Sequence, residues 1–88
     1  MNITMNITMA KEKESIVKQL EELVVEYQGR YYEEIKKSTE LTDKMLASKD
    51  NDQFRHFMAE LEDSRKDSMY LLGRIHAINE SLDIVKIG

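Results

Sequence analysis

Apolar side chains recur along this chain at steps that alternate between three and four residues. This spacing places them on one side of an α-helix and is typical of helices that pack along a seam. The first stripe consists of Val17, Leu20, Val24, Tyr27, Tyr31, Glu34, Ser38, Leu41, Met45 and Ser48. The second stripe consists of Phe54, Phe57, Leu61, Ser64, Ser68, Leu71, Ile75, Ile78, Leu82 and Val85. The two stripes predict one helix over residues 10–48 and another over residues 53–86.

Between the stripes lies the sequence Ser-Lys-Asp-Asn-Asp, a cluster of turn-forming residues. Asp50 stands three residues before Gln53, a spacing that resembles a capping box, in which the Asp side chain accepts from the free amides of the first helical turn. We therefore expect a turn over residues 49–52. The predicted fold is all-α: residues 10–88 form an antiparallel, coiled-coil-like two-helix hairpin.

A polar interruption in each stripe supports this hairpin. If the chain turns at Asn51, residues that face each other have numbers that add up to 102. Glu34 then meets Ser68, and Ser38 meets Ser64, which gives a central polar layer. Such a match is expected because a buried polar group needs a hydrogen-bonding partner. The layer could lock the register of the helices, or it could be a waist at which a partner docks.

Further apolar residues flank both stripes and widen the apolar side of each helix beyond a narrow seam. A hairpin of two helices has little core of its own, so we expect these residues to bind another surface. The simplest arrangement is a homodimer that forms a four-helix bundle, and the alternative is a helix of another protein. The predicted partner-binding residues are Ile16, Leu23, Tyr32, Ile35, Leu46, Met58, Met69 and Leu72.

Composition agrees with long helices in a single domain. The chain has 88 residues, of which 34% are charged, and it contains three glycines and no proline. Residues 1–8 repeat Met-Asn-Ile-Thr without an apolar helical face, so we expect a flexible tail over residues 1–9. The net charge of −4, with basic residues interleaved among acidic ones, argues against binding to duplex nucleic acid. No apolar run approaches the roughly 20 residues of a membrane span, and we expect a cytoplasmic protein.

The sequence offers little for catalysis. His56 precedes Glu60 by four residues, and His76 precedes Glu80 likewise, but a metal site needs three or four converging ligands. The chain has no cysteine, glycine-rich phosphate loop or nucleophile motif. We therefore predict a protein that is not an enzyme and that uses no metal and no other cofactor.

One resemblance concerns the C-terminal half. Met45-Leu46, Asp50 and Gln53-Phe54, followed by a long helix that ends in Ile-His-Ala-Ile-Asn-Glu-Ser-Leu, resemble the small helical-hairpin chaperones of bacterial type III secretion needles. This resemblance implies a bacterial, cytoplasmic chaperone that binds a helical partner protein. From the residues themselves we predict a self-associating interaction module that acts as a small adaptor or regulator, with a chaperone or inhibitor as the alternative.

Overall fold

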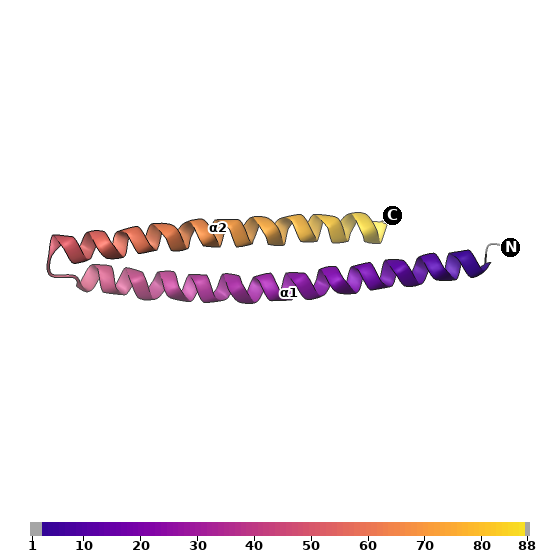
Figure 1. Cartoon of the computed structure of the whole chain (residues 1–88), viewed down its shortest axis with the longest axis horizontal. Helices are drawn as coiled ribbons and strands as arrows, with labels where there is room; N and C mark the ends of the chain where they lie inside the picture. The colour runs from indigo at the N-terminus through magenta and orange to yellow at the C-terminus, as the bar shows by residue number, and fades with distance from the viewer. Residues whose placement is uncertain (1–2, 88) are drawn as a thin grey trace.

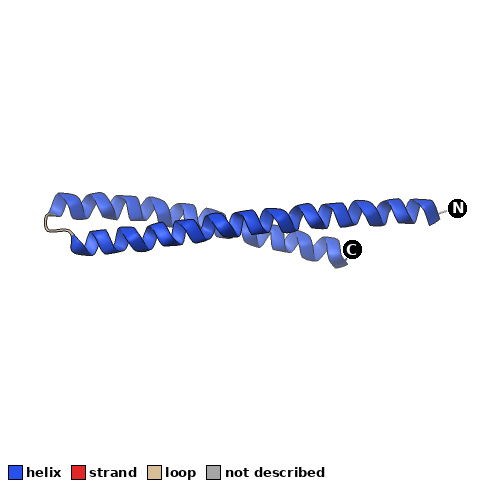
Figure 2. Cartoon of the chain, turned by 90° about the horizontal axis from the view of Figure 1, so that it is seen from below, coloured by secondary structure: helices blue, strands red, loops and turns tan. Residues whose placement is uncertain are grey.

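The computed structural model describes residues 3–87 as two long antiparallel helices, α1 (Ile3–Ala47) and α2 (Asn51–Ile87), joined by a three-residue loop (Figure 1). The helices cross over each other along their length (Figure 2). The rod measures 76 × 14 × 13 Å, with a radius of gyration of 20.6 Å. The prediction of an all-α antiparallel hairpin is thereby confirmed.

Side-chain hydrogen bonds at the loop define where the helices end. Ser48 closes α1 with its hydroxyl, which donates to the Lys44 carbonyl oxygen at 2.9 Å. Asp50 caps α2, because its Oδ1 accepts from the Gln53 amide at 2.8 Å. Since Asp50 itself is the cap, α2 begins at Asn51, two residues before the predicted start of the second helix.

The N-terminal segment differs from the prediction of a flexible tail over residues 1–9. α1 begins at Ile3, so residues 3–9 are helical, whereas residues 1–2 lie outside the described part of the chain. The physical reason is that helix propagation adds one hydrogen bond for each residue fixed, so an existing helix extends through residues of modest propensity. The start of α1 runs past the end of α2 (Figure 1), where the Lys13 Nζ donates to the Lys86 carbonyl oxygen at 3.5 Å.

The seam between the helices follows the two predicted stripes. Every residue of the first stripe is buried or half-buried, as is every residue of the second stripe except Phe54, which is 40% exposed. Ser38 Oγ lies 2.8 Å from Ser64 Oγ, which is the pair expected for a turn at Asn51. The most buried apolar side chains are Val24, Leu41, Leu71, Ile75 and Leu82. The core is therefore a single row of side chains from each helix.

Candidate interaction site

The central polar layer is a directed chain of hydrogen bonds between the helices. Ser64 has no exposed surface, and its hydroxyl lies 2.8 Å from both Glu34 Oε2 and Ser38 Oγ. A serine hydroxyl has one proton, which Ser64 donates to the Glu34 carboxylate; Ser38 therefore donates to Ser64. The chain runs from Ser38 through Ser64 to Glu34 and ends on a charged acceptor, which strengthens its last bond.

Ser68 takes a different partner from the one that the paired numbering suggests. Its hydroxyl donates to the Ser64 carbonyl oxygen at 2.9 Å, within α2, and Glu34 bonds to Ser64 instead. The long Glu34 side chain can reach a serine one turn away, whereas a serine on a helix readily bonds to the carbonyl four residues before it. Among the side chains that the structure describes, residues 9–87, no buried nitrogen or oxygen lacks a hydrogen-bonding partner. The layer is thus satisfied internally.

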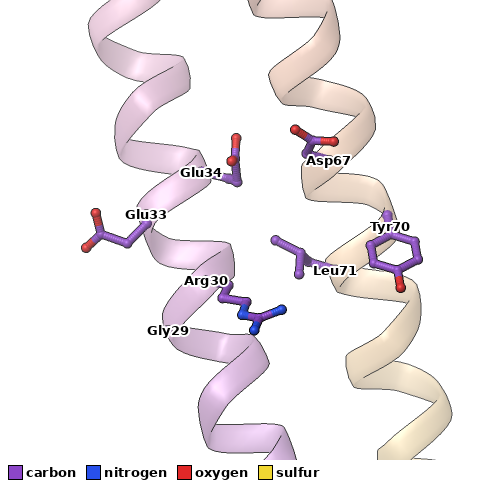
Figure 3. A pocket seen from close by; sticks show the side chains of 7 residues that line it. All are labelled: Gly29, Arg30, Glu33, Glu34, Asp67, Tyr70 and Leu71. Carbon is purple, nitrogen blue, oxygen red and sulfur yellow. The ribbon is translucent and has the colours of Figure 1, made fainter.

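A shallow hollow opens beside this layer. Figure 3 shows Glu34, Leu71 and Arg30 directed toward the space between the helices, whereas Glu33 points away from it. The hollow is lined by Gly29, Arg30, Glu33, Glu34, Asp67, Tyr70 and Leu71. Three of the lining residues are acidic (Glu33, Glu34 and Asp67) and one is basic (Arg30), so the charge around the hollow is predominantly negative.

Next to the hollow, tyrosines and arginines interleave across the seam. The Arg30 guanidinium lies 5.4 Å from the centroid of the Tyr27 ring, and the Arg74 guanidinium lies 5.6 Å from that of Tyr70. The nearby phenol groups of Tyr70 first, and then of Tyr27, raise the pKa of the exposed Arg74 guanidinium. Sequence reasoning missed both pairs, although each joins residues three or four positions apart in one helix, a spacing that places side chains next to each other.

The residues beside the stripes fall on two opposite faces of the hairpin. In an antiparallel pair, residues that directly follow a stripe residue lie on one face, and those that directly precede one lie on the other. One ion pair fixes this assignment: the carboxylate of Glu21, which follows Leu20, lies 3.5 Å from the Nζ of Lys86, which follows Val85. Gln28, Tyr32 and Leu72 likewise line one depression, whereas Leu23, Arg74 and Ser81 line another.

Six of the eight predicted partner-binding residues lie on the same face, and their side chains are 40–73% exposed. With Val25, which is 68% exposed and which sequence reasoning missed, they form what we call the apolar face. The apolar face consists of Val25, Tyr32, Ile35, Leu46, Met58, Met69 and Leu72. The other two predicted residues, Ile16 and Leu23, precede stripe residues and lie on the opposite face.

The opposite face is predominantly charged toward the loop. Arg30, Lys37 and Lys44 precede stripe residues of α1, and Glu60 and Asp67 precede those of α2. Basic residues of α1 and acidic residues of α2 therefore share this face. On the apolar face, by contrast, the exposed apolar residues cover the half of the hairpin nearest the loop, and Glu62 and Arg65 of α2 lie among them.

Neither histidine belongs to a cluster of metal ligands. His56 Nε2 lies 3.1 Å from Glu60 Oε1 on the exposed surface of α2. Over the described range 3–87, no three His, Asp or Glu side chains converge in a way that could hold a metal ion. Neither α1 nor α2, as far as the structure describes them, contains a stretch long and apolar enough to cross a membrane.

Comparisons of the chain with protein-family models, with curated proteins and with solved structures return no match. The candidate interaction site is therefore defined by its physical properties. These are a fully bonded polar layer inside the seam and an exposed apolar face on one side of it.

Proposed function

We propose that this chain is a non-enzymatic protein–protein interaction module, which binds a second copy of itself through the apolar face and acts as a small adaptor or regulator. The observation that carries the proposal is the gathering of six predicted partner-binding residues on one face, each at least 40% exposed. Exposed apolar patches of this extent are typical of surfaces that bind other proteins.

The size of the apolar face fits a dimer interface. From Val25 to Leu46 the face extends over 22 residues of α1. At a rise of 1.5 Å per residue this is about 32 Å, and two helices side by side are about 20 Å wide. Its projected area is therefore roughly 600 Å², close to the ~800 Å² that each partner contributes to a standard stable interface. Packing of two such faces would give a four-helix bundle with a second layer of core.

Sedimentation equilibrium at micromolar concentration tests the proposal. We expect a dimer for the wild-type chain and a monomer for Met69→Glu, which places a charge inside the interface. Ile84→Glu is the matched control, because Ile84 is 71% exposed but precedes a stripe residue, and so lies on the opposite face. A monomeric wild-type chain, or equal effects of the two variants, would overturn the proposal.

A second candidate is a bacterial cytoplasmic chaperone or inhibitor that covers its apolar face with a helix of another protein, as the resemblance to the needle chaperones implies. The exposure of the apolar face along both helices favours it, because an amphipathic helix can lie between α1 and α2. It predicts a monomer that is partly molten in isolation. A high melting temperature that is independent of concentration would contradict it.

A further inference from the structure

The α2 half of the apolar face contains two charged residues between two methionines. Met58, Glu62, Arg65 and Met69 are separated by four, three and four residues, and each directly follows a stripe residue. All four side chains are exposed. These steps read the same from either end of the segment. When the segment is read in reverse, Arg65 takes the place of Glu62, and each methionine takes the place of the other. A surface of this kind is complementary to its own antiparallel copy.

We infer that two hairpins pack through their apolar faces with their loops at opposite ends, so that α2 lies antiparallel to α2 of the partner subunit. This inference rests on the self-association proposed above and adds its geometry. The two-fold axis passes between Glu62 and Arg65. Glu62 then pairs with Arg65 of the partner subunit, Arg65 pairs with Glu62 of the partner subunit, and each Met58 packs against the partner's Met69.

The same axis sets α1 beside α1 of the partner subunit. Ile35 then lies opposite Thr39 and Thr42 of the partner subunit, so a large apolar side chain meets small ones. Thr39 and Thr42 direct their hydroxyls to the carbonyl oxygens of Ile35 and Ser38 in their own helix, at 3.0 and 2.8 Å. Their methyl groups are therefore available for apolar contact, and their polar atoms keep a partner inside an interface.

The other two-fold arrangement of the same faces leaves charges unpaired. If both loops lay at the same end, α2 would pack against α1 of the partner subunit. Glu62 would then lie near the partner's Thr39, and Arg65 near the partner's Ile35. Burying a charge without a partner is costly, so the arrangement with the loops at opposite ends is favoured.

Introduced cysteines test this geometry directly, because the natural chain contains none. The double variant Met58→Cys/Met69→Cys should form covalent dimers under mild oxidation. Each single variant should not, because identical positions would lie 11 residues apart, or about 16 Å along the helix, whereas bridged cysteines need Cα atoms within about 7 Å. Two cysteines of one chain are separated by the same distance and cannot bridge each other.

The outcomes separate this inference from the proposed function. A dimer in sedimentation whose double variant forms no disulfide, or whose single variants do, would overturn the geometry and leave self-association in place. A wild-type monomer would overturn both.

Charge reversal gives a measurement that does not depend on disulfides. We expect Glu62→Arg or Arg65→Glu alone to weaken dimerisation at least tenfold, through like charges across the axis, and the double reversal to restore the dimerisation constant to within about threefold. The matched control is Asp63→Arg with Lys66→Glu, singly and together, which has the same spacing on the outward side of α2. The control should change the constant by less than about twofold. Failure of the double reversal to restore dimerisation would contradict the inference.

Discussion

Replacement of Ser64 by alanine removes the middle member of the hydrogen-bonded chain that joins the two helices. Ser64 is completely buried, donates to Glu34 Oε2 at 2.8 Å and accepts from Ser38 at 2.8 Å. The change creates almost no cavity, because alanine differs from serine by one oxygen atom. Its effect therefore reports the hydrogen bonds rather than a loss of packing.

The expected loss of stability follows from the two bonds. A hydrogen bond to a charged group contributes about 1.5–3 kcal/mol, and one between neutral groups contributes about 0.5–1.5 kcal/mol. Glu34 is only half-buried and borders the hollow, so water can replace part of its lost partner. We expect Ser64→Ala to lower the free energy of unfolding by about 2–3 kcal/mol, and Ser38→Ala, which removes only the first bond, by about 1 kcal/mol.

Urea unfolding followed by circular dichroism at a fixed protein concentration measures these changes. Ser81→Ala is the control, because Ser81 is exposed and bonds only to the Ala77 carbonyl oxygen of its own helix. It should change the free energy of unfolding by no more than about 0.5 kcal/mol. In the Ser64→Ala background, Ser38→Ala should lower the free energy of unfolding by much less than it does in the wild type, because the Ser64 hydroxyl that accepts from Ser38 is already absent. Additive effects, or a Ser64→Ala variant as stable as the wild type, would refute the directed chain.

Two further predictions concern backbone positions. Gly29→Ala and Gly73→Ala should each raise the free energy of unfolding by about 0.8–1 kcal/mol. Both glycines are helical, and a Cβ at either position would meet no neighbouring side chain or other helix within 4 Å. A drop in thermal denaturation temperature for either variant would show that the site needs glycine. Asp50→Ala should lower the free energy of unfolding by about 1 kcal/mol, because the Gln53 amide loses the acceptor at 2.8 Å. Asp50→Asn should retain most of that stability in the same urea titration, and equal losses for both changes would argue against a capping role.

The seam between the helices was predictable from the sequence because the residues that form it recur at regular intervals along the chain. A step that alternates between three and four residues fixes which side chains of each helix face the partner, and the polar interruptions fix the register. Ser38 and Ser64 show this most clearly, since their facing numbers followed from the turn alone and their oxygen atoms lie 2.8 Å apart. Neither inference required knowledge of any individual side-chain conformation.

The remaining features depend on reach and on context. Glu34 bonds one turn away from the residue that the numbering places opposite it, because the length of its side chain decides the partner. The helical state of residues 3–9 depends on the helix that follows them, whereas propensity describes only the segment itself. The division of the exposed apolar residues between two faces was present in the sequence, in whether each residue precedes or follows a stripe residue. Val25 would have been found by the same rule.

The elongated shape of the hairpin determines how its mass must be measured. A compact protein with a radius of gyration of 20.6 Å would contain roughly 360 residues, by the usual scaling of size with chain length. A gel-filtration column calibrated with globular standards would therefore overestimate the mass of a single chain of 88 residues. An early elution volume is the natural result of a thin rod, and a monomer would pass for an oligomer unless its mass were determined without assuming a shape.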